Sequence, residues 1–458
     1  MMFSGEHSVK IFSRRKRPPH LGKYPMEKIK RVEKTTTLII EDEVKRVPRR
    51  ADGFVRADHG DFGEKQKQAR IRTGSSTIKG AKVPLNGAFG DNIRNLASLH
   101  DGEVATEKAP ISDDPEVIAN NMKSLGYFLD ADVIGICEAK ERCWYSHDKD
   151  GNAIEARHKY AIVMLIDQGF YTNDASTGDD WISGSQSYRA YLRGAEIGNI
   201  MASYIRNLGY EARCHSAMDS QVLHLPLIME AGLGELSRIG EVVINPFLGP
   251  RFKSVVVTTN IPLIIDKPID FGLQDFCSKC RKCARECPVG AIPYGDKIMY
   301  NGYETWKPDV PNCTSYRVSN PKGAGCGRCM KVCPWNNEGI MVYRFAVWLA
   351  IKLPFTRKFF AWVDDFIDNG NQNDTHRWWF DLDNDKGKII VPKATNEKDI
   401  TPNKPIPKNH RISNYTVDML PNFDDLGAVP FDRKGGWDVK NTLETPTEAR
   451  ARQKNKQA

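Results

Sequence analysis

Eight cysteines lie between positions 277 and 333, and their spacing constrains this chain more than any other feature. The first run is Cys277-x2-Cys280-x2-Cys283-x3-Cys287-Pro288. This is the spacing of a bacterial ferredoxin half-site, in which each x2 step carries the next thiolate around one corner of an iron-sulfur cluster. The second run lacks a third closely spaced cysteine but has one upstream, as Cys313-x12-Cys326-x2-Cys329-x3-Cys333-Pro334. The segment therefore supplies enough thiolates for a pair of clusters.

The two runs are expected to exchange their last cysteines. In two-cluster ferredoxins the fourth cysteine of a run binds the other cluster, and the proline after it turns the chain away. We therefore assign a first cysteine set, which consists of Cys277, Cys280, Cys283 and Cys333. The second cysteine set consists of Cys287, Cys313, Cys326 and Cys329. Each set is predicted to hold one 4Fe-4S cluster.

Zinc and disulfides are the alternatives for a cysteine-rich segment. Paired CxxC motifs also form tetrahedral zinc sites, but an x2-x2-x3-CP run has no function around a single tetrahedral ion. The runs are also too regular for a disulfide framework. The remaining cysteines are isolated and are expected to be buried thiols: Cys137, Cys143 and Cys214.

Length and charge narrow the class of protein. At 458 residues the chain is long enough for several domains. Its 66 Lys and Arg residues against 58 Asp and Glu residues give a net charge of +8, too mild an excess to indicate nucleic-acid binding. Part of the excess lies in the run from Arg14 to Arg17 and in the last residues of the chain. We interpret both as solvated tails; a docking patch for an acidic electron donor or a membrane surface is the alternative.

Neither a membrane-spanning segment nor an export signal is predicted. No stretch reaches the roughly 18 apolar residues that a membrane-spanning helix needs. The most apolar candidate, 340–351, contains Arg344 and is interpreted as a buried amphipathic helix rather than a membrane contact. The paired arginines near the N-terminus are not followed by an apolar segment, so this numbering contains no export signal. A cytoplasmic location is expected, with peripheral membrane association as the alternative.

The sequence divides the chain into four parts. Residues 1–114 are polar and turn-rich, as in an N-terminal extension that wraps another core, and 115–269 alternate helical and apolar segments. Residues 270–339 hold the cysteines, and 340–458 begin with a helical stretch and end in a polar tail. Strands that alternate with helices predict an α/β sheet layer covered by helices in the second part. A core of this size is more than electron transfer needs, so the clusters are expected to pass electrons to a further acceptor.

Individual elements follow from the periodicity of apolar residues. Strands are predicted at 131–137, 160–166, 211–215 and 254–258. Helices are predicted at 115–129, 183–208, 225–230 and 340–368. Gly209 directly follows the longest helix and is expected to cap its C-terminus.

The electron acceptor is inferred from a resemblance to a known protein family. A Rossmann flavin or nicotinamide site is unsupported, because no G-x-G-x-x-G motif opens a helix after a strand. The chain also lacks Asp-x-His-x-x-Gly, by which some proteins bind cobalamin through a histidine. The order of an α/β core, FCxxCxxCxxxCP and Cx12CxxCxxxCP, with Asn245-Pro246-x2-Gly249-Pro250-Arg251 upstream, resembles the cobalamin-dependent reductive dehalogenases and their relatives, the epoxyqueuosine reductases. The resemblance covers about residues 115–380.

The resemblance implies a fold, a cofactor and a reaction. The fold is α/β (α+β), with a nitroreductase-like core that carries base-off cobalamin and a bacterial-type ferredoxin domain with two 4Fe-4S clusters, flanked by N- and C-terminal wrapping extensions. The reaction replaces a carbon–halogen bond of an organohalide by a carbon–hydrogen bond, with electrons passing through the clusters to cobalamin. An external ferredoxin, flavodoxin or membrane quinol chain supplies the electrons, and no nucleic acid takes part.

The resemblance also implies site residues. Reductive dehalogenases place a catalytic tyrosine on the long helix, which corresponds here to Tyr191, and Ser187 one turn earlier shares its face. A free tyrosine has a pKa of about 10, so a neighbouring cation is expected to stabilise the phenolate that forms. Arg251 of the Gly-Pro-Arg motif is the first candidate for this cation, and Lys253 is the second. The expected cobalamin contacts are His215, Asn245 and Gly249.

Two other functions stay open. Epoxyqueuosine reductases share the cysteine layout but use an acidic donor at the position of Tyr191. They also carry a basic helical-repeat domain, which the non-repetitive C-terminal part of this chain does not resemble. An electron-transfer subunit without a substrate of its own is the third hypothesis, and a bound corrinoid would separate it from the first two.

Overall fold

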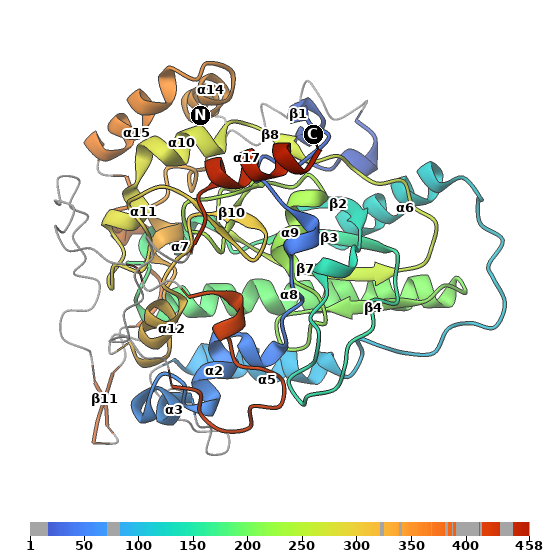
Figure 1. Ribbon diagram of the computed structural model, residues 1–458, viewed down its shortest axis with the longest axis horizontal. Helices are drawn as coiled ribbons and strands as arrows, with labels where there is room; N and C mark the ends of the chain where they lie inside the picture. Colours follow the sequence, from blue (N-terminus) through green and yellow to red (C-terminus); the bar gives the residue numbers. More distant parts are fainter. Residues whose placement is uncertain are drawn as a thin grey trace.

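A four-stranded antiparallel sheet forms the centre of the molecule. The computed structural model describes residues 17–70, 83–320, 325–338, 341–367, 369–380, 383–386, 388–390, 412, 415–430 and 443–457. The strands lie in the order β2-β3-β7-β4 (Figure 1). Their bounds are β2 (Val133–Glu138), β3 (Tyr160–Asp167), β7 (Phe252–Thr259) and β4 (Ala212–His215). The register pairs Met164 of β3 with Ile134 of β2 on one side and with Val255 of β7 on the other.

Both faces of the sheet are buried, because apolar side chains point to alternate faces along each strand. In β7, Val255 and Val257 join the core beneath α6 (Pro115–Phe128) and α8 (Trp181–Asn207). Val256 lies between them in sequence and joins the opposite core, beneath α9 (His224–Glu230). Two helical layers therefore cover the sheet, which explains why β2 and β3 are almost continuous apolar runs.

The long helix α8 approaches the sheet unusually closely through its glycines. It starts after Asp180, a residue type favoured at helix N-termini, and ends before Gly209, which has a φ of +85°. A Cβ atom at Gly198 would lie 2.6 Å from Val255 Cγ2 and 2.7 Å from Cys214 Sγ. The absence of a side chain at Gly198 thus lets the helix backbone rest on β7 and β4.

Replacement of Gly198 by alanine is expected to destabilise the fold. The added methyl would force apart α8 and β7, and overpacking of this kind costs about 1 to 3 kcal/mol of unfolding free energy. Gly87→Ala is the matched control, because a Cβ atom there meets nothing within 4 Å, and the helix around it should gain up to about 1 kcal/mol. Urea unfolding of the two variants measures the difference, and equal midpoints would contradict this packing.

The segment before the sheet both wraps the core and adds to it. Its short strand β1 (Lys30–Arg31) pairs with β8 (Ile269–Asp270), so residues far apart in sequence lie side by side. Its helices are α2 (Gly53–His59), α3 (Glu64–Arg70) and α5 (Pro84–Ala97). Helix α5 packs along α8, where Leu96 O accepts a hydrogen bond of 2.8 Å from Asn199 Nδ2. This helix was not predicted from the sequence.

The cysteine segment forms short helices and hairpins on one side of the sheet. Its helices are α10 (Leu273–Cys280), α11 (Lys282–Arg285), α12 (Val310–Ser319) and α13 (Arg328–Lys331). The accompanying pairs of short strands are β5 (Glu235–Leu236) with β6 (Val243–Ile244) and β9 (Ile298–Tyr300) with β10 (Tyr303–Thr305). The remaining elements are α7 (Phe170–Ala175), α14 (Met341–Lys352), α15 (Thr356–Phe366), β11 (Asp383–Asp385), β12 (Lys388–Ile390) and α17 (Pro446–Gln457).

Most sequence-based expectations about the fold are confirmed. The chain mixes helices with a sheet, each of the four central strands lies where the sequence predicts a strand, and the glycine after α8 caps that helix. The three isolated cysteines are buried free thiols. The stretch 340–368 is helical as predicted, and it forms two helices because Pro354 cannot continue α14. One expectation is wrong: α14 is not a buried helix, because Phe345 and Trp348 are exposed, although Val347 and Ile351 pack on the core. None of the described helices has the length and apolar character that crossing a bilayer requires.

Candidate functional site: two cysteine sets beside a tyrosine–lysine pair

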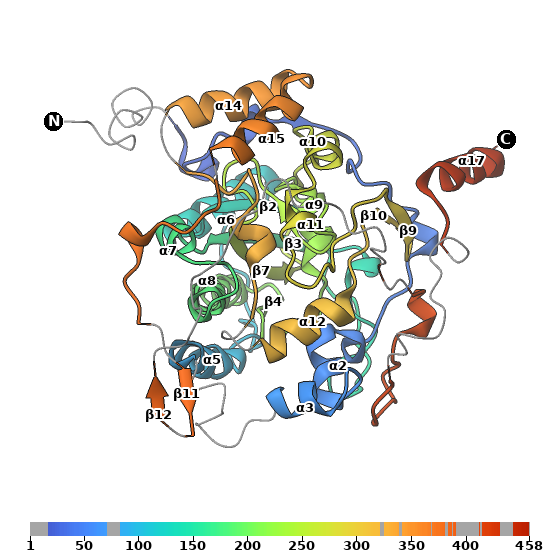
Figure 2. The same cartoon turned by 90° about the vertical axis from the view of Figure 1, so that its left-hand side faces the viewer.

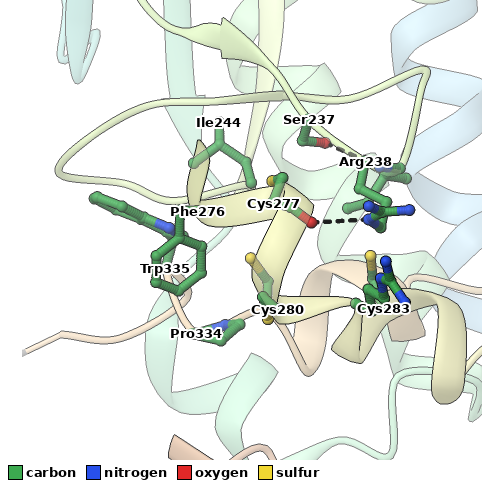
Figure 3. A pocket seen from close by; sticks show the side chains of 12 residues that line it. Ser237, Arg238, Ile244, Phe276, Cys277, Cys280, Cys283, Pro334 and Trp335 are labelled. Atoms are coloured by element: carbon green, nitrogen blue, oxygen red, sulfur yellow. Dashed lines mark hydrogen bonds between the residues drawn. The ribbon is translucent and has the colours of Figure 1, made fainter. Parts of the chain in front are cut away.

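The first cysteine set surrounds one cavity. Cys277 and Cys280 come from α10, Cys283 comes from α11, and Cys333 follows α13. All four line the same cavity, which Phe276 and Trp335 close on one side and Arg238 closes on the other (Figure 3). Phe276 and Trp335 pack edge to face, with ring centroids 5.5 Å apart. In the described residues no three His, Cys, Asp or Glu side chains converge on a position for a single metal ion.

The cysteine thiols raise one another's pKa values mainly within each of the two predicted sets. Burial raises the pKa of Cys333 well above its ordinary value, and the Cys277, Cys280 and Cys283 thiols raise it further. Burial raises the pKa of Cys329 to about 12, with Cys313 and Cys287 adding to the shift. Protons are lost from such thiols when a metal binds them. The two groups of neighbouring thiols are thus suited to metal binding, and the ligand assignments themselves remain predictions.

The two cysteine sets are neighbours. Burial raises the pKa of Cys283 well above its ordinary value, and Cys329 of the second set is among the thiols that add to the shift. Cys283, Cys287 and Cys329 also pack against one small apolar cluster around Ile239 and Ile292. Clusters held by these sets would therefore lie close enough for electrons to pass between them.

Arg238 is a buried cation beside the first cysteine set. Its side chain is 2% exposed. The guanidinium donates hydrogen bonds to the carbonyls of Cys277, Pro293 and Gly295 at 2.8, 2.8 and 3.0 Å. It also lies over the ring of Trp306, 4.6 Å from the centroid. Within the described part of the chain no carboxylate pairs with it, so its charge faces the thiolates.

Removal of this cation is expected to lower the reduction potential of the cluster in the first cysteine set. A buried positive charge favours the more negative, reduced cluster. Arg238→Met should reduce the equilibrium constant for reduction roughly tenfold, which corresponds to about 59 mV for a one-electron couple. A redox titration followed by electron paramagnetic resonance measures the shift. Arg281→Gln is the control, since this neighbour is exposed and solvent screens its charge; equal potentials in all three proteins would contradict the role of Arg238.

The predicted catalytic tyrosine contacts a lysine. Lys253 Nζ of β7 lies over the ring of Tyr191 of α8, 5.3 Å from its centroid, and both side chains are half-buried. Tyr188 packs edge to face on the same ring at 6.4 Å. Ser187, one turn before Tyr191, donates a hydrogen bond of 3.4 Å to Gln168 Oε1. The close approach of α8 to β7 brings this tyrosine and lysine together.

Arg251, the first candidate for the cation, is engaged elsewhere. It is 1% exposed and forms a bidentate ion pair with Asp167, with Nε–Oδ1 and Nη2–Oδ2 distances of 2.9 and 3.2 Å. Its Nη1 donates a hydrogen bond of 2.9 Å to Asn336 Oδ1, in the segment after Cys333. The structure thus places Lys253, the second candidate, beside Tyr191 and gives Arg251 partners that join the sheet to the cysteine segment.

The predicted cobalamin contacts are spread over two places. Asn245 and Gly249 close a buried turn, in which each backbone N–H donates to the carbonyl of the other at 3.0 and 2.9 Å. Gly249 has a φ of +61°, and a Cβ atom there would lie 2.1 Å from the carbonyl oxygen of Trp335. His215 is the fully buried last residue of β4, and its side chain lies 2.8 Å from Thr258 Oγ1 and 3.1 Å from Arg213 Nη1. Burial lowers the pKa of His215 well below its ordinary value.

A second cation near Tyr191 was not predicted. Arg317 of α12 lies over the ring of Phe54, 4.6 Å from the centroid. Burial lowers its pKa, but the nearby Cys313 thiol and Tyr191 phenol raise it above the ordinary arginine value. Its Nε has no hydrogen-bond partner among the described residues. Arg317 lies one helical turn after Cys313, a predicted cluster ligand, so the two residues share one face of α12. This spacing is the signal by which the sequence could have indicated Arg317.

Comparison with known proteins gives a family match for the cysteine segment and relatives that cover a larger part of the chain. The family described as "4Fe-4S dicluster domain" matches residues 276–337. A tetrachloroethene reductive dehalogenase of Sulfurospirillum multivorans is 34% identical over 188 residues, which cover 39% of this chain and 36% of that protein. An epoxyqueuosine reductase of Shewanella oneidensis is 26% identical over 300 residues, covering 54% of this chain and 72% of that protein.

The solved structures include one with a similar fold over almost the entire chain. The catabolic reductive dehalogenase NpRdhA has a TM-score of 0.91 and 47% identity, covering 98% of this chain and 65% of that protein. The same enzyme has been solved in complex with 3-bromo-4-hydroxybenzoic acid. This chain therefore spans somewhat less than two thirds of the solved relative and about a third of the tetrachloroethene enzyme.

Proposed function

Because this chain is a homologue of the reductive dehalogenases, with the epoxyqueuosine reductases as more distant relatives, we propose that it replaces a carbon–halogen bond of an organohalide by a carbon–hydrogen bond. The reaction consumes a pair of electrons and a proton and releases a halide ion. The observation that carries the proposal is the position of Arg317, whose charge is influenced by both the Tyr191 phenol and the second cysteine set. The proposed proton donor and the proposed electron carrier thus influence the same cation.

The acceptor between them is proposed to be a corrinoid in its base-off form. When bound, this cofactor supplies the redox chemistry that cleaves the carbon–halogen bond. Unpaired buried polar atoms in this part of the protein fit such a ligand. Both amide atoms of Gln186 on α8 and the Nε of Arg317 lack partners among the described residues. Such atoms are expected where a ligand completes the hydrogen bonds, and a corrin ring carries amide groups that both donate and accept.

Electrons are proposed to pass from the first cysteine set to the second and then to the corrinoid. The order is supported by two contacts. The thiols of Cys283 and Cys329 are electrostatic neighbours, which links the sets. Arg317 is influenced by Cys313, Cys326 and Cys329 as well as by Tyr191, which supports the proposal that the second set is the one nearer to the reaction. A reduced ferredoxin, a flavodoxin or a membrane quinol chain is the proposed external donor.

Tyr191 is proposed as the proton donor to the carbon that loses the halide. Its hydroxyl carries a transferable proton and brings no negative charge into the site before the reaction. Lys253 is proposed to stabilise the phenolate as the proton leaves, because an adjacent positive charge favours the ionised form. The contact between Lys253 and the Tyr191 ring at 5.3 Å supports this pairing.

The substrate is proposed to be a halogenated aromatic compound with an anionic group. NpRdhA, which is 47% identical to this chain, was solved with a brominated hydroxybenzoic acid. The free Nε of Arg317 could bind a phenolate or carboxylate oxygen through a charge-assisted hydrogen bond. Arg317 is thus the proposed substrate-orienting residue.

Halide release from reconstituted protein tests the function. The chain is loaded anaerobically with iron, sulfide and cobalamin, reduced chemically and supplied with 3-bromo-4-hydroxybenzoate or tetrachloroethene. Bromide release from the aromatic substrate, at a higher kcat/KM than chloride release from tetrachloroethene, is the expected result. Reduction of epoxyqueuosine in tRNA without halide release would support the second hypothesis instead. Reduced clusters without corrinoid binding would indicate an electron-transfer subunit.

A further inference from the structure

Helices α14 and α15 form a hairpin at the periphery of the molecule, beside α10 (Figures 1 and 2). The outer side of this hairpin carries large apolar side chains. No other segment of the described structure buries them. They include Phe355 and Phe366, which are 78% and 73% exposed. Exposed patches of this kind on a folded protein usually mark a contact with a partner or a membrane. We name the patch the aromatic face; it consists of Phe345, Trp348, Phe355, Phe359, Trp362 and Phe366.

The side chains of the aromatic face form ring contacts within each helix rather than a scatter of single residues. Phe359, Trp362 and Phe366 follow one another at helical spacing on α15, so they share one side of the helix. The Trp362 and Phe366 rings stack at 5.3 Å between centroids, and the Phe345 and Trp348 rings stack on α14 at 5.9 Å. These side chains are therefore preorganised for a flat apolar environment.

The described acidic side chains of α15, and Asp275 of α10, are engaged in ion pairs. Asp364 binds buried Lys282 at 2.6 Å, and Asp365 binds Arg285 at 2.6 Å. On α10, Asp275 binds Arg357 at 2.9 Å. These ion pairs tie the hairpin to the cysteine segment and remove negative charge from its outer side.

The exposed charges beside the aromatic face are positive. Arg344 and Lys352 on α14 and Lys358 on α15 are exposed. Lys352 is one turn after Trp348, and Lys358 is one turn before Trp362, so both lie on the aromatic side. Within the described residues none of the three cations forms an ion pair. Aromatic residues interspersed with lysine and arginine are typical of helices that lie in the interface of an anionic membrane.

We propose that the aromatic face docks this protein onto an anionic lipid bilayer, with α14 and α15 lying along its surface. A second copy of the chain fits less well, because a two-fold contact would press the same unpaired cations against each other. A transiently bound redox protein also fits less well, since such contacts are small and polar. Anionic headgroups satisfy the cations while the rings enter the acyl boundary.

Docking in this orientation has a consequence that rests on the proposed function. Helix α15 packs on α10, whose Cys277 and Cys280 belong to the first cysteine set. The cluster in this set would then be the one nearest to the membrane. A membrane-bound donor could reduce it there, while the substrate reaches Tyr191 beyond the second set.

Vesicle flotation tests the docking without substrate, so its result is independent of dehalogenation. The anaerobically reconstituted full chain is mixed with vesicles of phosphatidylcholine alone or with added phosphatidylglycerol. Binding is expected only with the anionic vesicles and should weaken as salt is added. Phe359→Ser combined with Trp362→Ser should reduce the partition coefficient more than roughly tenfold. Lys352→Gln combined with Lys358→Gln should reduce it by roughly tenfold or more.

Phe128→Ser is the matched control, because this side chain is 81% exposed on α6, away from the aromatic face. It should bind anionic vesicles like the wild type. Failure of the wild type to bind anionic vesicles would overturn the proposal, as would binding that the serine variant retains. Light scattering supplies a further check. A wild-type dimer that the serine variant converts into a monomer, with no vesicle binding, would assign the face to a second copy and also overturn the proposal.

Discussion

Tyr191→Phe is expected to slow halide release by a factor of about a hundred to ten thousand. The substitution removes one hydroxyl and keeps the ring, so the edge-to-face contact with Tyr188 and the contact with Lys253 should persist. The only function lost is the transfer of a proton to the carbon from which the halide departs. Single-turnover halide release in the reconstituted protein measures this step.

The control for this variant is its content of cofactors. Iron and cobalt per chain should equal those of the wild type, because Tyr191 belongs to neither cysteine set. Tyr188→Phe, which changes the neighbouring ring on the same helix, should retain most of the activity. Normal halide release by Tyr191→Phe would exclude this residue as the proton donor.

Lys253→Met is expected to reduce kcat by roughly ten- to a hundredfold, since the phenolate would form without its adjacent cation. The stability of the protein should change little, because Lys253 is half-buried and has no ion pair among the described residues. The pH dependence of kcat separates this role from a structural one. A proton donor acts only while it is protonated, so the decline of kcat at high pH should occur at a higher pH in Lys253→Met than in the wild type.

Arg251→Met distinguishes the two candidate cations. Asp167 would lose the partner that it binds at 2.9 Å, and breaking a buried ion pair costs about 3 to 5 kcal/mol of unfolding free energy. This variant is therefore expected to fail mainly in stability, measured by thermal unfolding. A stable Arg251→Met protein with a selective loss of kcat, together with an active Lys253→Met protein, would reverse the assignment.

The central strands and the cysteine segment were predictable because their signals are local. The strands β2, β3 and β7 are buried on both faces, so they stand out as apolar runs between polar turns, whereas β4 also contains Arg213 and His215. The cysteine runs follow the geometry of a cluster rather than that of the surrounding fold. Spacing alone therefore predicts the dicluster segment that the family comparison matches at residues 276–337.

The choice between Arg251 and Lys253 could not be made from the sequence. The two residues are two positions apart near the start of β7, so strand alternation gives both the same side. The outcome depends on Asp167 at the end of β3, which is paired with Phe252 in the register and binds Arg251. It also depends on Gly198, which lets α8 approach β7 closely. Both residues act through contacts between segments that are far apart in the sequence.

The outer helices were misjudged for a related reason. The apolar residues of 340–351 predict a helix with a buried side, but periodicity does not tell whether a partner covers that side. Here the inner side of the hairpin is tied to α10 by Arg357, and the aromatic side is left exposed. Helix α5 was missed because glycine and asparagine interrupt its apolar pattern, and its contacts with α8 compensate for weak intrinsic helix propensity.

The metal content of the reconstituted chain shows whether it holds the cofactors that the proposed reaction needs. A pair of 4Fe-4S clusters and a corrinoid correspond to about eight iron atoms and about one cobalt atom per chain after removal of unbound metal. Cys283→Ser should reduce the iron content to about half, since one cysteine set loses a ligand while the other stays complete. A wild-type chain that holds only about half of the expected iron, or that retains no cobalt, would contradict the account.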